Sequence, residues 1–251
     1  MNVDVNLVEQ LVKKVLDQVE GAGDLLTTAG DCGVFETMDD AINAAEAGQR
    51  QYLKCSMADR AKYVQTIRDV VLRKDVMEYI SRQAVEETGM GGYEYKVIKN
   101  TLAATKTPGV EDLTTEALSG DDGLTLVEYS PFGVIGSITP TTNPTETVIC
   151  NSIGMLAAGN AVVFSPHPRA KNVTLYLIKA INRALKEAGA PDNLVVTVAE
   201  PSIENTNAMM KHPKVRMLVA TGGPGIVKTV LSSGKKAIGA GAGNPPVVVD
   251  E

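Results

Sequence analysis

The sequence predicts an α/β protein with a doubly wound parallel sheet that is preceded by helices. In residues 131–169 an apolar β-branched run, a helical segment and a second β-branched run form one strand, crossover helix, strand unit. Further strand and helix patterns alternate after this unit at similar spacing. Before it, residues 38–106 have almost entirely helical periodicity. These three observations together favour a parallel sheet with a helical amino-terminal part.

Length, charge and cysteine usage exclude several classes of protein. The chain has 251 residues, which suffices for one large domain or two, and a formal net charge of -6 with scattered basic residues. A nucleic-acid partner is therefore not expected. No apolar segment is long enough to span a bilayer, and the acidic amino terminus is unlike a signal peptide. Cys32, Cys55 and Cys150 lack paired or metal-ligand spacing, which predicts reduced thiols and no metal site.

Residues 1–20 predict an amphipathic helix, and residues 21–36, rich in Gly, Asp and Thr, predict a flexible linker. A helix on a linker leaves its apolar face in need of a partner. That partner is either outside the domain, the domain itself, or another copy in an oligomer. Acids and bases are balanced on the polar face, which argues against a membrane. The apolar stripe consists of Leu7, Val8, Leu11, Val12, Val15, Leu16 and Val19.

Helical segments fill the next part of the chain. They begin at Asp39 and Asp40 and continue over residues 57–71, 76–88 and 93–106. Glu86 and Glu87 resemble an acid pair awaiting a metal, but adjacent side chains point about 100° apart on a helix. No histidine lies in that segment. We interpret the two carboxylates as a solvated face before a helix stop.

The remaining elements follow from turn residues and periodicity. Residues 120–129 alternate after a turn and predict one strand outside the crossover pattern. The glycine-rich residues 239–243 open no helix, so they make a weak phosphate loop, and no dinucleotide fingerprint follows the first strand. After the central unit we expect helices at 170–188, 202–212 and 226–231 and strands at 194–198, 217–220 and 247–249.

Two polar turns of the central unit predict a ligand site. Residues 139–143 follow the first strand and residues 165–167 the second. Because carboxyl ends of parallel strands open on a common crevice, these hydroxyl, amide and imidazole groups should converge. The same residue types also cap helices, so the turns alone leave both interpretations open. The other histidine, His212, precedes Pro213 at a helix end, where a cation suits the helix dipole. Neither histidine is expected to be a general base.

Four segments carry a resemblance to a known family: PFGVIGSITPTTNP, LAAGNAVVFSPHP, ATGGPGIVK and GAGAGNPPVVVDE. In this order they resemble the nucleotide-binding core of the CoA-acylating aldehyde dehydrogenases, which make acetyl-CoA or propionyl-CoA in bacterial microcompartments. The wider family has a proline-tryptophan-asparagine turn and a lysine-proline pair. Here Thr141 and Thr142 replace the tryptophan and asparagine of that turn. The segment Ser165-Pro166-His167 replaces the lysine-proline pair, which resembles the acylating branch of the family. The resemblance covers essentially the whole chain and implies a nucleotide-binding domain of the aldehyde dehydrogenase type over residues 37–251.

The resemblance implies a site for NAD, with NADP as the alternative. Glycines have a physical use there, because a missing Cβ lets backbone N–H groups approach phosphate oxygens. The implied contacts are Thr139, Pro140, Thr141 and Thr142 at the nicotinamide ribose, Ser165, Pro166 and His167 at the adenosine ribose, and Thr221, Gly222, Gly223 and Ile226 along the pyrophosphate.

The family's chemistry oxidises a short aldehyde, acetaldehyde or propionaldehyde, through a cysteine thioester to its acyl-CoA, reversibly. The nucleophilic cysteine of the family lies beyond residue 251, so this chain is expected to be the cofactor-binding part of a longer enzyme and inactive alone. The glutamate by which hydrolytic members activate water falls at Ala240, which favours CoA over water as acceptor. The alternative is an inactive fragment that serves as microcompartment cargo or as an oligomerisation module.

An oxyanion donor is implied at the first polar turn. Ungapped comparison sets Thr142 opposite the asparagine that serves this role in the wider family. We favour Asn143, because an amide N–H is a better fixed donor than a rotating hydroxyl and Pro144 restricts the backbone. The alternative is that Asn143 caps the helix that begins near Thr145.

The resemblance also implies partners. Residues 1–20 would direct the enzyme to a microcompartment shell inside the bacterial cytoplasm. The strand near residues 120–130 would belong to a protruding sheet used in homo-oligomer contacts.

Overall fold

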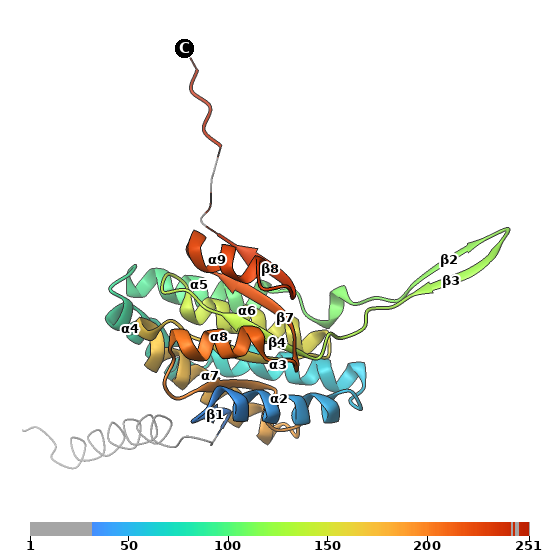
Figure 1. Cartoon of the computed structure of the whole chain (residues 1–251), viewed down its shortest axis with the longest axis horizontal. Helices are drawn as coiled ribbons and strands as arrows, with labels where there is room; N and C mark the ends of the chain where they lie inside the picture. Colours follow the sequence, from blue (N-terminus) through green and yellow to red (C-terminus); the bar gives the residue numbers. More distant parts are fainter. Residues whose placement is uncertain (1–31, 242, 244–245, 251) are drawn as a thin grey trace, which may run out of the picture.

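The computed structural model describes residues 32–241, 243 and 246–250 (Figure 1). Its centre is a six-stranded sheet in which all neighbouring strands are parallel, in the order β1-β6-β5-β4-β7-β8. The predicted α/β fold with a parallel sheet is confirmed. The strands are β1 (Val34–Phe35), β4 (Val134–Ile138), β5 (Ala161–Ser165), β6 (Val195–Val198), β7 (Val215–Thr221) and β8 (Lys236–Ala240).

The strand order reverses beside β4. From β4 the chain moves through β5 to β6 on one side, and β7 then returns to pair with β4 on its other side. In an open parallel sheet such a reversal leaves a crevice at the carboxyl ends of the strands, because the connecting helices leave in opposite directions. The topology therefore provides a binding crevice at the ends of β4 and β7.

Four helices precede the central unit, as predicted: α2 (Met38–Tyr52), α3 (Met57–Leu72), α4 (Lys74–Thr88) and α5 (Tyr93–Lys106). Ser56 begins α3 with a capping box, in which its hydroxyl accepts from the Asp59 N–H and the Asp59 carboxylate accepts from the Ser56 N–H. Gly89 ends α4 with φ of 67°, a left-handed conformation that glycine adopts without a Cβ penalty. Local caps thus explain where these helices begin and end.

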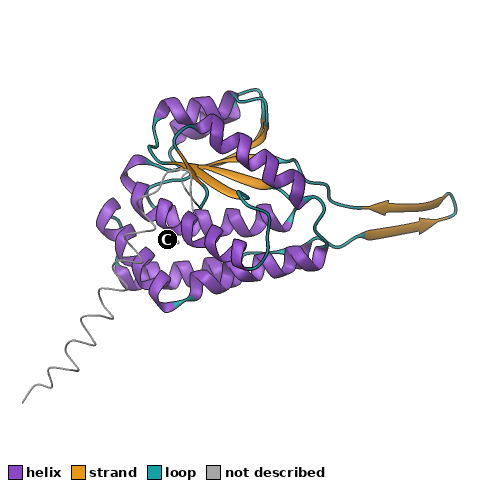
Figure 2. Cartoon of the chain, turned by 90° about the horizontal axis from the view of Figure 1, so that it is seen from below, coloured by secondary structure: helices purple, strands orange, loops and turns teal. Residues whose placement is uncertain are grey.

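Helices cover both faces of the sheet (Figure 2). On one face α2 and α8 pack together over β5, β6, β4 and β7, and on the other α6 and α7 separate the sheet from α3, α4 and α5. The buried side chains of these layers form one contiguous core, in which Phe164, Ile149 and Leu177 are fully enclosed. Each such side chain contributes about 1.5–3 kcal/mol by leaving water. The remaining helices are α6 (Pro144–Ala157), α7 (Lys171–Glu187), α8 (Ile203–Lys211) and α9 (Pro224–Leu231), with short 3₁₀ turns η1 (Val110–Asp112) and η2 (Pro168–Ala170).

The structure corrects several expectations. Residues 34 and 35, assigned by the sequence to the linker, form β1 and pair with β6. The single strand expected at 120–129 is a hairpin of β2 (Glu116–Gly120) and β3 (Gly123–Val127), which projects from the body (Figures 1 and 2). Residues 247–249 form no strand. The sixth strand of the sheet is β8, which was not predicted and which ends inside the glycine-rich run 239–243 interpreted as a weak phosphate loop. The amphipathic helix expected over residues 1–20 lies outside the described residues.

Glu87 differs from the solvated residue that the sequence suggested. Its two carboxylate oxygens accept hydrogen bonds from the N–H groups of Asn172 and Val173 at 2.9 and 2.8 Å. These are orphan donors in the first turn of α7, where a negative charge also suits the helix dipole. Glu87 therefore caps α7 from a neighbouring helix. Within the described part of the chain, no helix is long and apolar enough to cross a membrane.

Candidate functional site

A cleft of about 1060 Å³ opens at the carboxyl ends of β4, β5 and β7, where the topology predicts one. Every residue assigned to the cofactor or the oxyanion by the sequence lines this cleft. The described residues that line it include no Asp, Glu, Lys or Arg. Its size is at the upper end of that of ligand pockets, about 300–1000 Å³, so an extended ligand fits. The predicted lining residues are Thr139, Pro140, Thr141, Thr142, Asn143, Ser165, Pro166, His167, Thr221, Gly222, Gly223 and Ile226.

Thr139 directly follows β4, and its hydroxyl lacks a protein partner among the described residues. Its N–H donates to the Ser165 carbonyl oxygen at 3.2 Å, which continues the sheet pairing past β4. The residue is 2 % exposed, and among the described residues its Oγ1 finds no hydrogen-bond partner. A buried hydroxyl without a partner is unfavourable, so this atom is available to a polar ligand in the cleft.

Ser165 is the last residue of β5, and His167 follows two residues later. Ser165 is 2 % exposed, and its Oγ lies 2.7 Å from Thr206 Oγ1, which ties the end of β5 to α8. His167 Nδ1 accepts from the Arg169 N–H at 3.1 Å. Loss of water around the ring, and then the positive charge of Arg169, lower the pKa of His167 below its ordinary value. The imidazole therefore favours the neutral form.

Helix α8 forms a wall of the cleft that sequence reasoning missed. A Cβ on Gly136 of β4 would lie 2.9 Å from Leu218 Cδ2 and 3.1 Å from Met209 Sδ, so glycine permits α8 to pack closely on β4. The sequence did contain a signal for this wall: polar residues occupy the first two turns of α8 after its Ser202 cap. That end of the helix follows the carboxyl end of β6, where a ligand crevice is expected. The wall consists of Ser202, Ile203, Thr206, Asn207 and Met210.

The turn between β7 and α9 forms the opposite wall. The Gly222 N–H donates to the Ala240 carbonyl oxygen at 3.1 Å, which joins this turn to the end of β8. Gly223 begins α9 without a side-chain cap, and Pro224 follows at the first helical position. A Cβ on Gly222 would lie 3.0 Å from Ile226 Cγ2, so the glycine keeps the turn tight against the helix. The first turn of α9 thus presents uncapped backbone donors next to the cleft.

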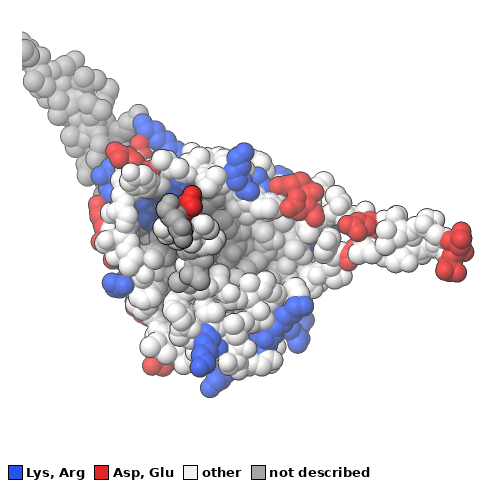
Figure 3. All heavy atoms as spheres, turned by 90° about the horizontal axis from the view of Figure 1, so that it is seen from above, with Lys and Arg blue, Asp and Glu red and all other residues white. Residues whose placement is uncertain are grey.

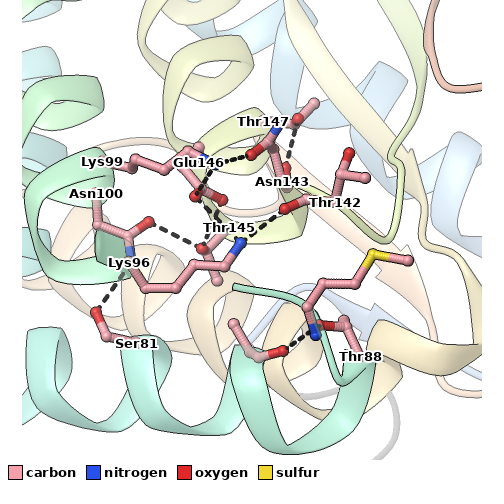
Figure 4. Close-up of polar contacts among 12 residues, drawn as sticks. Ser81, Thr88, Lys96, Lys99, Asn100, Thr142, Asn143, Thr145, Glu146 and Thr147 are labelled. Carbon is pink, nitrogen blue, oxygen red and sulfur yellow. Dashed lines mark hydrogen bonds and ion pairs between the residues drawn. The ribbon is translucent and has the colours of Figure 1, made fainter. Parts of the chain in front are cut away.

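Asn143 occupies the N-cap position of α6, but its side chain makes no capping hydrogen bond. Its Oδ1 instead accepts from Lys99 Nζ of α5 (Figure 4). The side-chain capping that the sequence left open as an alternative is therefore wrong in this structure. Thr142 is exposed beside it, and its carbonyl oxygen accepts from Lys96 Nζ at 2.7 Å.

The other residues considered as catalytic lie away from the cleft. His212 Nε2 lies 2.9 Å from Asp39 Oδ1, which joins the end of α8 to α2, in keeping with a structural role. Cys150 accepts a hydrogen bond from Thr107 Oγ1 at 3.1 Å and packs against the core, and Cys55 also packs there. The described residues contain no group of three or more His, Cys, Asp or Glu side chains suited to a metal.

Comparison with known proteins identifies the family of this chain. The model of the Aldehyde dehydrogenase family matches residues 21–251. The chain belongs to the aldehyde dehydrogenase family. Among curated relatives, the propanal dehydrogenase (CoA-propanoylating) of Salmonella typhimurium is 52% identical over 219 residues, which cover 87% of this chain and 47% of that protein. The resemblance to CoA-acylating members is confirmed, and the chain spans about half the length of the curated relatives it matches.

Solved structures agree. A Rhodopseudomonas palustris propionaldehyde dehydrogenase with bound CoA and an acylated cysteine is 74% identical, with a TM-score of 0.84 over 86% of this chain and 49% of its own. An engineered glycolyl-CoA reductase with bound NADP+ is 73% identical, with a TM-score of 0.86 over 89% of this chain and 51% of its own. A propionaldehyde dehydrogenase from a Clostridium phytofermentans fucose utilisation microcompartment is 52% identical, with a TM-score of 0.82 over 85% and 49%.

Proposed function

We propose that this chain is the cofactor-binding part of an enzyme that oxidises a short aldehyde to its acyl-CoA, reversibly and with NAD. The observation that carries the proposal is the cleft, since one crevice of a family member collects every residue that the sequence assigned to the cofactor and the oxyanion. Acetaldehyde and propionaldehyde are the proposed substrates, in keeping with the names of the similar proteins. The enzyme would act in the bacterial cytoplasm inside a microcompartment, and the similar Clostridium protein comes from a bacterial microcompartment.

The residues of the cleft fit a dinucleotide. The partnerless Thr139 hydroxyl is suited to a ribose hydroxyl, and the backbone donors that follow Gly222 and Gly223 are suited to phosphate oxygens. The cofactor supplies hydride acceptance when bound. Because no described lining residue is acidic, nothing in this set repels the extra phosphate of NADP. We propose NAD as the cofactor, and the lack of acidic groups in this set leads us to expect that NADP binds as well.

Asn143 and Ala240 take the two other roles. Asn143 would donate from Nδ2 to the aldehyde oxygen as negative charge develops there. Ala240 ends β8, and its carbonyl oxygen holds the Gly222 N–H at the cleft. A methyl side chain at this point provides no general base for water, which leaves the acyl group for the CoA thiol.

Cofactor binding is tested on the 251-residue chain by calorimetric titration with NAD and NADP. Ser165→Glu is a poor probe, because it would bury a carboxylate at a position that is 2 % exposed. Asn207→Glu adds the same charge at an exposed position of the cleft wall and should weaken binding about tenfold or more. Gly222→Val should also weaken binding, by crowding Ile226 and the backbone donors.

Ala208→Glu is the matched control, because it adds the same charge to the next exposed residue of α8, about 100° around the helix. It should leave the affinity nearly unchanged. Equal affinities for all of these proteins would remove the cleft as the cofactor site.

Activity is tested by NAD reduction with aldehyde and CoA. The 251-residue chain should be inactive, and a version extended through the second half found in its relatives should be active. In the extended enzyme, Ala240→Glu should raise NAD reduction in the absence of CoA. An extended enzyme that is inactive with short aldehydes would instead support the cargo or oligomerisation function.

A further inference from the structure

A buried ion pair lies beneath the turn that carries Asn143 (Figure 4). Lys96 of α5 is 2 % exposed, Glu146 of α6 is 7 % exposed, and Lys96 Nζ lies 3.3 Å from Glu146 Oε1. Removing two charges from water is unfavourable unless further hydrogen bonds satisfy them. Lys96 Nζ also donates to the carbonyl oxygen of Thr142 at 2.7 Å. The backbone of the turn is thus one of the groups that stabilise the buried ammonium.

Polar contacts around this carboxylate link three helices. Thr145 Oγ1 lies 3.1 Å from Glu146 Oε2 and 2.8 Å from Asn100 Oδ1, and the Asn100 amide donates to Ser81 Oγ at 3.1 Å. Glu146 Oε1 also lies 3.5 Å from Lys99 Nζ. The polar contacts therefore run from α4 through α5 to α6, and a buried network of this kind favours one arrangement of its members.

This network reaches the proposed oxyanion donor through Lys99. Lys99 Nζ donates to Asn143 Oδ1, while the backbone carbonyl of Asn143 accepts from the N–H and the hydroxyl of Thr147 at 3.1 and 2.6 Å. An amide has one acceptor oxygen and two N–H donors, so fixing Oδ1 on an ammonium leaves Nδ2 free to donate. Asn143 borders the main cleft and the two smaller cavities beside it.

We propose that Lys99 is a positioning residue that orients the Asn143 amide toward the reacting oxygen. The Lys96–Glu146 pair anchors the turn that carries Asn143. The role of Lys99 rests on the proposed function of Asn143. Lys99 is the member of the cluster that can be changed safely, because its side chain is 46 % exposed, whereas Lys96 and Glu146 are buried.

The kinetic test uses the extended enzyme. Lys99→Met should lower kcat about tenfold, as expected for a lost charge-assisted hydrogen bond, with the KM values for aldehyde and NAD nearly unchanged. Lys99→Arg should restore most of kcat, since a guanidinium still donates to Oδ1. In an Asn143→Ala background, which itself should lower kcat about 10²-fold, Lys99→Met should have no further effect.

Lys74→Met is the matched control, because it removes the same charge from α4, where Lys74 faces Glu78 of its own helix at 3.9 Å. It should leave kcat unchanged. A loss from Lys99→Met that is equal in both backgrounds, or no loss in either, would overturn the positioning role.

A second readout needs no catalysis. In the ¹⁵N-labelled 251-residue chain, the side-chain amide signals of Asn143 are identified by their disappearance in Asn143→Ala. Lys99→Met should shift those signals and Lys74→Met should not, and unshifted signals would also overturn the proposal. If the extended enzyme has no acylating activity, the proposed function fails, while these amide signals still decide whether Lys99 orients Asn143.

Discussion

At the scale of the residue, His167 makes the stability of the chain dependent on pH. Its pKa is lowered from 6.5, and its neutral ring accepts from the Arg169 N–H. Between the lowered pKa and 6.5 the unfolded chain binds a proton that the folded chain does not, so stability is complete above 6.5 and falls as pH falls through that window. Urea unfolding on both sides of 6.5 should show a smaller decline for His167→Asn, which keeps an acceptor without titrating. Identical declines in the two proteins would contradict this prediction.

At the scale of the element, Gly33 determines how the edge strand β1 joins the sheet. Its φ is 86°, and a Cβ there would lie 2.4 Å from Asn182 Nδ2 and 2.5 Å from the Val195 carbonyl oxygen. Gly33→Ala should therefore reduce the free energy of unfolding by about 1–2 kcal/mol for the left-handed backbone and by a further ~1–3 kcal/mol for the clash.

Gly89→Ala separates the two effects, because Gly89 has φ of 67° with nothing within 4 Å of a built Cβ. It should lose only the backbone part. Chemical denaturation of the two variants compares them directly, and equal losses would show that the contacts of Gly33 with Asn182 and Val195 are unimportant.

The hairpin of β2 and β3 is the second element that predicts a measurable property. Leu124 and Leu126 lie on one of its faces and are 66 % and 62 % exposed, while Leu118 on the other face is 61 % exposed. Figure 3 shows acidic side chains at the tip and base of the arm and uncharged ones between them. Such an exposed apolar surface on a projecting arm favours a protein partner.

We propose that this partner is another copy of the chain. The double variant Leu124→Ser and Leu126→Ser should lower the molar mass measured by light scattering during gel filtration. Thr125→Ser, between the two leucines but on the opposite face, is the control and should leave the mass unchanged. A double variant with the mass of the unmodified protein would argue against homo-oligomer contacts through this arm.

At the scale of the whole molecule, we expect the folded body to be stable without the predicted targeting helix. The buried core of the described residues begins at Val34, and β1 enters the sheet directly at that point. Deleting residues 1–21, which lie outside the described residues, should leave the melting temperature nearly unchanged and abolish recovery with microcompartment shell proteins. A deletion that instead lowers the melting temperature strongly would favour a helix that folds back on its own domain.

The sequence by itself determined most of the elements and where the cleft opens. The periods of the central unit specified β4, α6 and β5, and parallel strands must bring the turns after β4 and β5 to one edge. It could not specify β8 or the first strand of the hairpin, because short runs with glycine carry little periodicity and depend on a neighbouring strand. It also missed the α8 wall, whose place is set by close packing against Gly136. Only the tertiary structure could join Lys99 to Asn143, because that contact spans 44 residues and exists only when α5 packs against α6.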